Sequence, residues 1–174
     1  GTLAALGLSR PHMPYKGLIM AILISPMIVP LIITAAGMFF FYARINLVYS
    51  FTGIILAHVA LATPFVVITV TATLVGFDMN MVKASQSLGA RPIRTFFKVI
   101  MPLILPGVIS GALFAFITSF DEVVIVMFMG SLDQLTIPKQ MWAGIRQEIS
   151  PVILCMATCL VVLSILLLTT VELL

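Results

Sequence analysis

The hydrophobic residues of this chain are grouped into long stretches that charged side chains separate. Four stretches contain no Asp, Glu, Lys or Arg: residues 17–43, 45–77, 99–120 and 149–171. A helix that crosses a membrane needs about 20 mostly apolar residues. The pattern therefore predicts four membrane-spanning helices, at residues 18–42, 50–75, 103–128 and 151–172.

The length of these stretches decides between helices and strands. Buried strands usually run for about 4–8 residues, and the strands of a membrane barrel alternate polar and apolar residues, which these stretches do not. The chain is 61% hydrophobic and 9% charged, whereas soluble domains carry about 25% charged residues. We therefore predict an all-α fold, a polytopic membrane helix bundle, and interpret residues 1–174 as one transmembrane domain.

Proline, glycine and cysteine residues inside the spans refine this prediction. Prolines are expected to kink a helix because they remove a backbone donor, and four lie within the spans: Pro26, Pro30, Pro64 and Pro106. Gly107 and Gly111 form a small-xxx-small pair that permits close helix contact. Cys155 and Cys159 lie four apart on one predicted helix, which disfavours a disulfide, and we expect them to pack in the bundle.

The basic residues predict the orientation, because cytoplasmic loops carry more Lys and Arg than outer loops. Six basic residues lie on one side of a four-span arrangement: Arg10, Lys16, Lys83, Arg91, Arg94 and Lys98. Arg44, Lys139 and Arg146 lie on the other side. The N-terminal tail and the 77–101 loop are therefore predicted in the cytosol. The 43–48 turn and the 130–150 segment are predicted to face outward.

The 77–101 loop contains the signals of a helix–glycine–helix elbow. Asp78 is a suitable N-cap, and its charge favours the positive end of a helix. Gly89 is typical of the left-handed residue that ends a helix, and Pro92 suits the first turn of the next one. The simpler alternative is an ordinary basic loop that follows the orientation rule.

The spacing within this loop resembles the cytoplasmic loop of permease subunits from binding-protein-dependent ABC importers. That family has E-A-A, three residues, G, nine residues and I-x-L-P. Here Lys83-Ala84-Ser85 is followed by Gly89 and then by Val99-Ile100-Met101-Pro102 at the same spacing. The resemblance implies a type I ABC importer permease fold. It also implies that an elbow couples the permease to its ATP-binding subunit, through Lys83, Ala84, Ser85, Gly89, Ala90, Arg91 and Pro92. Lys83 replaces the family's acidic residue, so a salt bridge made by that acid is not expected here.

Further segments resemble the second permease of spermidine/putrescine importers. These are Leu8-Ser9-Arg10, Ser119-Phe120-Asp121-Glu122-Val123, Thr136-Ile137-Pro138 and Ile149-Ser150-Pro151. The match lacks about two N-terminal membrane helices, so we expect the chain to be truncated there. The resemblance implies a bacterial inner-membrane importer of a polyamine or similar organic cation, with iron, thiamine or an aminophosphonate as alternatives. Its implied partners are ATP-binding subunits, a solute-binding protein and a second permease subunit, either a copy or a paralogue.

Three residues are candidates for the translocation path. Asp121 and Glu122 lie near the outer end of the third predicted span, where carboxylates are costly unless they face a cavity or a partner. A path for organic cations would use such groups, with Asp121 the stronger candidate. His58 lies in the middle of the second span and is the third candidate. The alternatives are an exposed or paired position for the acids and a bond between helices for His58.

Residues 136–149, within the outer amphipathic segment 130–150, are predicted to form an amphipathic helix on the outer surface. Ile137, Met141, Ile145 and Ile149 follow one another at intervals of four, with Trp142 as an interface anchor. By the resemblance, this surface receives the solute-binding protein, which Asp133, Arg146 and Glu148 could contact. A helix that simply lies on lipid fits the same pattern.

Several function classes are not expected. The chain has no Ser-His-Asp arrangement in one loop and no Gly-rich phosphate loop with its Lys, so we expect no enzyme activity, no cofactor and ATP only on a partner. Metal-ligand spacings and basic runs with interleaved aromatics, which would indicate a metal or nucleic-acid site, are also missing. A secondary carrier driven by an ion gradient is the main alternative, although no internal repeat supports it.

Overall fold

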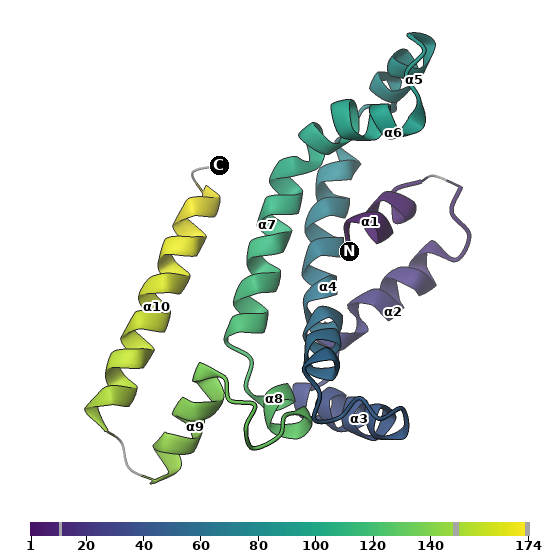
Figure 1. Cartoon of the computed structure of the whole chain (residues 1–174). Helices are drawn as coiled ribbons and strands as arrows, with labels where there is room; N and C mark the ends of the chain where they lie inside the picture. The colour runs from purple at the N-terminus through teal and green to yellow at the C-terminus, as the bar shows by residue number, and fades with distance from the viewer. Residues whose placement is uncertain (11, 148–149, 173–174) are drawn as a thin grey trace.

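The computed structural model describes residues 1–10, 12–147 and 150–172, and within these ranges the chain is helical and has no β-strand (Figure 1). The helices are α1 (Thr2–Leu8), α2 (Lys16–Ile28), α3 (Leu31–Arg44), α4 (Phe51–Val75), α5 (Met79–Ser87), α6 (Pro92–Thr95), the π-helix η1 (Phe96–Ile100), α7 (Met101–Phe120), α8 (Val124–Met129), α9 (Ile137–Gln147) and α10 (Pro151–Glu172). The predicted all-α fold is confirmed.

Three helical segments of the described chain are long and apolar enough to cross a membrane without a break. They are Phe51–Val75, Pro92–Phe120 and Pro151–Thr170. The first predicted span is wrong as a single helix, because α2 and α3 are bent by 106° at a short break. The break lies at Val29 and Pro30, both extended, with ψ of 136° and 130°. Proline disfavours helical geometry in the residue before it and cannot donate a backbone bond.

The third predicted span is also corrected at both of its ends. It begins at Pro92 rather than 103, because α6, η1 and α7 follow one another as one helical segment. It ends at Phe120, and α8 is a separate short helix. The prolines inside α4 and α7, Pro64 and Pro106, leave those helices continuous.

The pair α4 and α7 forms the centre of the bundle. A Cβ atom on Gly107 would overlap the side chain of Thr73, and one on Gly111 would come within 2.5 Å of the Thr69 hydroxyl. The predicted small-xxx-small contact is therefore confirmed, and Val66 of α4 forms part of it. The two backbones approach so closely that neither glycine position has room for a side chain.

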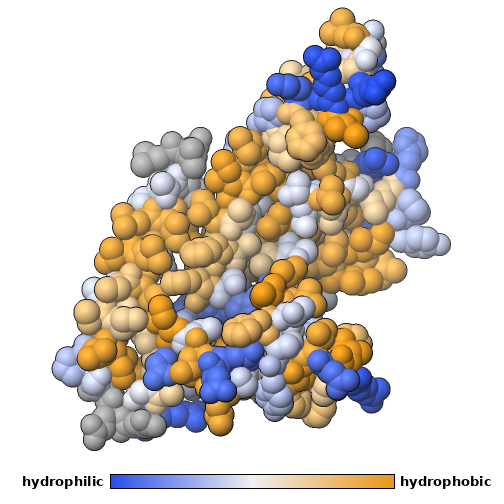
Figure 2. Space-filling model, in the orientation of Figure 1, coloured by the Kyte–Doolittle hydropathy of each residue, from blue (hydrophilic) through white to orange (hydrophobic). Residues whose placement is uncertain are grey.

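Two buried clusters flank this pair. One joins α1, α4 and α7 through Ala5, Val70 and Ile104. The other joins α3, α4 and α8 through Ala35, Ala57, Leu61, Ile125 and Met129. Most other apolar side chains remain exposed, and Figure 2 shows them as a broad orange surface. The free thiols Cys155 and Cys159 are exposed on α10, so the expectation that they pack within this bundle is wrong.

The elbow and the short helices lie at opposite ends of the α4–α7 pair. Figure 1 shows α5 and α6 at one end, and α3, α8 and α9 at the other. Blue side chains gather at both ends in Figure 2, with orange between them. This arrangement suits a bundle whose middle faces lipid and whose ends face water.

Candidate functional site

The first arm of the elbow is built from local capping interactions. The Asp78 carboxylate accepts a bond of 2.9 Å from the Asn80 amide at the start of α5. At its end, the amides of Gly89 and Ala90 donate to the carbonyls of Gln86 and Ser85 at 2.9 and 3.1 Å. This pair of bonds is a Schellman motif, which requires a left-handed residue. Gly89 supplies it with a φ of +80°, so the predictions that Asp78 caps α5 and that Gly89 adopts the left-handed conformation are confirmed.

The second arm is the beginning of the long spanning helix. Arg91 is extended, with ψ of 154°, and Pro92 occupies the first turn of α6 as predicted. The hydroxyl groups of Ser85 and Thr95 lie 2.9 Å apart and join the two arms. Thr95 is only 2% exposed. Thr95 was not predicted from the sequence as part of the elbow. The signal that could have indicated it is the hydroxyl group of Ser85, at a position where the resembled family has alanine.

The outer surface of the elbow combines apolar and basic side chains. Leu88 is 89% exposed and Ile93 74% exposed. Lys83, Arg91, Arg94 and Lys98 are exposed around them. A concave surface of about 540 Å³ lies between the arms, lined by residues that include Ser85, Gly89 and Ala90. The elbow thus offers a shaped, positively charged surface at one end of the bundle.

A larger groove of about 760 Å³ lies at the other end of α4 and α7. The α2–α3 break lines one side of it, through Pro26 and residues 27–31. The opposite side is the end of α7 and the turn before α8, including Thr118, Asp121 and Glu122. The groove therefore exists because Pro30 breaks one helix while residues 121–123 interrupt another. Both carboxylates that the sequence singled out line it.

The two carboxylates have different environments. Asp121 is exposed. Glu122 is 6% exposed, and both of its carboxylate oxygens accept bonds of 2.9 Å from the Ile125 amide. A third bond, of 3.3 Å, comes from the Val126 amide. Glu122 therefore stabilises the start of α8, since a carboxylate at this place satisfies free amides of the new helix.

His58 lies beside Glu122 in the structure although 64 residues separate them. Its Nδ1 is 2.8 Å from the Ser119 hydroxyl, and its Nε2 is 3.9 Å from a Glu122 oxygen. The structure thus brings together His58, Ser119 and Glu122, from α4, α7 and the turn before α8. Of the three predicted path residues, Asp121 alone is exposed in the groove.

The helix predicted in the 130–150 segment is observed as α9, which ends at Gln147. The Arg146 guanidinium lies 5.7 Å from the centre of the Trp142 ring, a cation–π distance. Lys139 donates to the carbonyls of Ser131 and Gln134 at 3.0 and 3.1 Å. Glu148 and Ile149, predicted as part of this helix, lie outside the described residues. Asp133 is exposed on the preceding loop.

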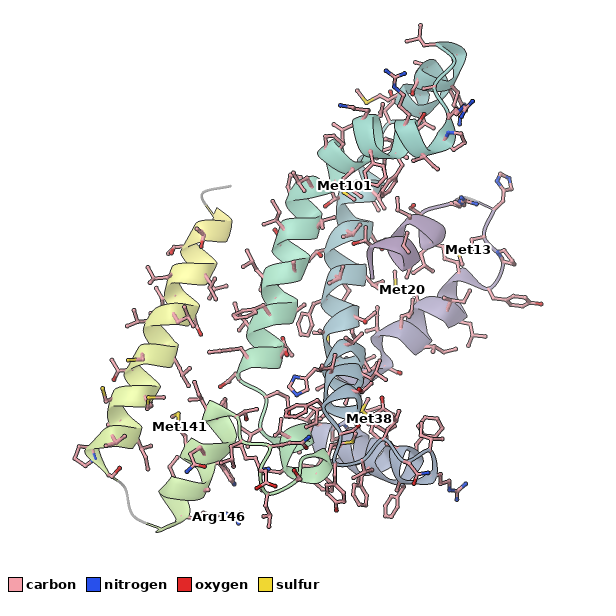
Figure 3. All side chains as sticks on the ribbon, viewed as in Figure 1. Met13, Met20, Met38, Met101, Met141 and Arg146 are labelled. Atoms are coloured by element: carbon pink, nitrogen blue, oxygen red, sulfur yellow. The ribbon has the colours of Figure 1, made fainter. Side chains whose placement is uncertain are left out.

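The described residues contain no group of three or more His, Cys, Asp or Glu side chains that could hold a metal ion. Figure 3 labels five methionines, of which Met13 lies in the α1–α2 connection and Met20, Met38, Met101 and Met141 lie on α2, α3, α7 and α9, and it labels Arg146 at the far end of α9. Methionines spread in this way fill space between helices. The acidic group exposed in the groove is the Asp121 carboxylate, which can attract a positive charge.

Comparison with protein families gives a match over the whole chain. The family described as "Binding-protein-dependent transport system inner membrane component" matches residues 1–174. The spermidine/putrescine transport system permease protein PotC of Haemophilus influenzae is 31% identical over 164 residues, which are 94% of this chain and 64% of that protein. PotC of Escherichia coli K12 is 30% identical over 164 residues and is covered to 62%. The chain therefore spans less than two thirds of the length of these relatives.

Another transport permease and a solved transporter structure are also similar to this chain. The putrescine transport system permease protein PotI of E. coli K12 is 29% identical over 140 residues, covering 77% of this chain and 50% of that protein. Among solved structures, an inward-facing MetNI methionine ABC transporter superposes with a TM-score of 0.75 at 20% identity. It covers 98% of this chain and 82% of the other. This superposition shows the fold that the two chains share.

Proposed function

This chain belongs to the family of binding-protein-dependent transport system inner membrane components, and from that premise we propose that it forms part of the solute path of an ATP-driven importer. The proposed solute is a polyamine or a similar organic cation, as the names of the relatives suggest. The groove at Asp121 is proposed as its contact on this chain, since an exposed carboxylate in a groove attracts a cation.

One structural observation supports the coupling part of the proposal above all others. The elbow and the groove lie at the two ends of one helical segment, Pro92–Phe120. At 1.5 Å per residue, its 29 residues extend over roughly 40 Å, enough to cross a membrane. Any displacement of the elbow therefore moves the helix end that precedes Asp121. ATP-driven motion of a partner can change the groove in this way without a flexible linker.

The remaining parts of the assembly follow from the same proposal. ATP is bound by a separate subunit that docks on the elbow at the cytosolic face, and this chain is not itself an enzyme. A second permease subunit, a copy or a paralogue, completes the path, and a solute-binding protein delivers the cation at the face that bears α9. Two conformations that bind ATP with different affinity are the requirement for such coupling.

Dependence on the ATP-binding subunit tests the proposal directly. The full-length permease is reconstituted in liposomes with its ATP-binding subunits and binding protein, and uptake of labelled spermidine is measured with and without ATP. Uptake should require ATP and stop when the phosphate-loop lysine of the partner is replaced. Uptake that persists without the ATP-binding subunits and follows an ion gradient would instead support a secondary carrier.

The Asp121→Asn variant tests the proposed role of the exposed carboxylate. We expect spermidine uptake to fall at least about tenfold, because a lost bond between charged groups costs roughly 1.5–3 kcal/mol. Transport of a neutral solute through the same protein should be unaffected. Asp121→Glu is the matched control, since it keeps a carboxylate at the same place in the groove, and it should keep most of the uptake. Equal losses in both variants would contradict the proposed contact.

A further inference from the structure

The imidazole of His58 lies inside the bundle with one of its two nitrogens unsatisfied. Its side chain is 14% exposed. Nδ1 is within hydrogen-bond distance of Ser119, at 2.8 Å. Nε2 is buried and has no hydrogen-bond partner among the described residues. A buried polar atom without a partner is costly and calls for an explanation.

The group that faces this free nitrogen is the Glu122 carboxylate, at 3.9 Å. This distance is too long for a hydrogen bond and short enough for strong attraction between charges where water is excluded. The side chain of Glu122 is itself only 3% exposed. Small rotations of either side chain would bring the two groups into contact.

The other neighbours of His58 contribute little charge. A small cavity of about 310 Å³ beside it is lined by Phe116, Ser119, Phe120, Thr136, Ile137 and Pro138, none of which titrates. On α3, Tyr42 packs on the cluster that contains Ala57. On α9, Lys139 donates to backbone carbonyls. Asp121 is the remaining charged group of the turn and is exposed.

Glu122 connects this site to the shape of the groove. Its carboxylate binds the first amides of α8, and α8 packs on α3 and α4 through Ile125 and Met129. The same residue lines the groove next to Asp121. Whatever holds Glu122 in place therefore also holds the turn that forms one wall of the groove.

We propose that His58 is a positioning residue whose protonation ties the turn before α8 to α4. In the neutral tautomer that donates from Nδ1 to Ser119, Nε2 carries no proton and Glu122 is held by α8 alone. When the second nitrogen gains a proton, it becomes a donor and carries positive charge toward Glu122, and charge-assisted bonds of this kind are strong. Acidic conditions therefore order α8 and the groove wall, and alkaline conditions release them. The contact itself is independent of the proposed transport, but its effect on uptake rests on that function.

The experiment measures the mobility of α8 without relying on transport. A nitroxide is attached to a cysteine at Met127, which is 45% exposed on α8, in a full-length Cys155→Ala, Cys159→Ala background. Spectra of the protein in lipid vesicles are recorded at about pH 5 and pH 8, the interval in which imidazoles change charge. We expect the ratio of mobile to immobile label to rise at least about threefold at the higher pH.

Variants separate His58 from other causes of pH dependence. His58→Gln should make the ratio independent of pH, and Glu122→Gln should do the same, because an amide still accepts from the α8 amides but has no charge. His12→Gln, which changes the other histidine of the chain, should keep the pH dependence. Identical spectra at both pH values in the unaltered protein, or a shift that persists in His58→Gln, would overturn the proposal.

Uptake of spermidine at the two pH values then tests the link to transport. If the proposed function holds, the ratio of uptake at the two pH values should differ between the unaltered protein and His58→Gln. No ATP-dependent uptake at either pH, together with a normal spectral shift, would refute the proposed function and leave the His58 contact supported.

Discussion

Replacing Gly107 by leucine should leave little folded protein in the membrane. The α4–α7 contact has no room at this position, because even a single Cβ would overlap Thr73 and come within 3.1 Å of the Thr69 carbonyl. Overfilling a packed interior usually costs about 1–3 kcal/mol, and here the obstruction includes backbone, which cannot rotate away. The amount of monodisperse protein after detergent extraction and its thermal unfolding temperature are the measurements.

Gly37→Leu is the matched control for this prediction. Gly37 lies inside α3, and a Cβ there meets nothing within 4 Å. Leucine also favours helix over glycine by roughly 1 kcal/mol. Normal yield for Gly37→Leu with loss for Gly107→Leu would locate the effect in the α4–α7 contact. Equal yields for the two variants would show that the helices do not approach as closely as described.

Gly89→Val should separate ATP hydrolysis from uptake while the protein remains folded. A Cβ at Gly89 meets no atom within 4 Å, but the φ of +80° is unfavourable for any other residue. The left-handed conformation costs about 1–2 kcal/mol for an L-residue, and a β-branched side chain is among the worst for it. The elbow then loses its turn, and the docking geometry is populated roughly ten times less. Spermidine uptake should fall by about that factor, with ATP hydrolysis continuing.

Two other replacements distinguish backbone geometry from the loss of a glycine. Gly89→Asn should retain most uptake, because asparagine tolerates the left-handed region better than other residues. Gly76→Val changes the glycine that ends α4 with a φ of −85° and open space around it, so uptake should persist. Uptake that stays normal in Gly89→Val would exclude the elbow as the coupling element.

The elbow shows how far local signals reach. Asp78, Gly89 and Pro92 act on the backbone within a few residues of themselves, so their positions in the sequence predict the caps, the turn and the new helix start. The Ser85–Thr95 bond was not predicted. This bond joins the two arms of the elbow, and the angle between the arms depends on the conformation of the whole turn. The spacing of residues in the sequence therefore does not predict which side chains meet across a left-handed glycine.

The breaks in the membrane helices, in contrast to the elbow, could not be predicted from local signals. The prolines at positions 26, 30, 64 and 106 carry the same chemical signal, yet the break occurs at Pro30, while α2, α4 and α7 contain a proline and continue. A proline leaves one backbone carbonyl of its helix without a donor, and contacts with neighbouring helices decide where this carbonyl is accommodated without a break. The interruption at residues 121–123 likewise depends on Glu122 turning back to the amides of α8, which hydropathy alone cannot show.

The sequence alone determined that the chain is a helical membrane protein, where its apolar segments lie, and that a glycine elbow of family-specific spacing joins two of them. These properties depend on composition and on neighbours within about one helical turn. The tertiary structure alone decided that the α2–α3 break and the 121–123 turn face each other across a groove. It also placed His58 against Ser119 and Glu122, 61 and 64 residues away. Contacts of this kind depend on how whole helices pack. No local sequence pattern relates two side chains that are far apart in the chain, and only the folded backbone brings them together.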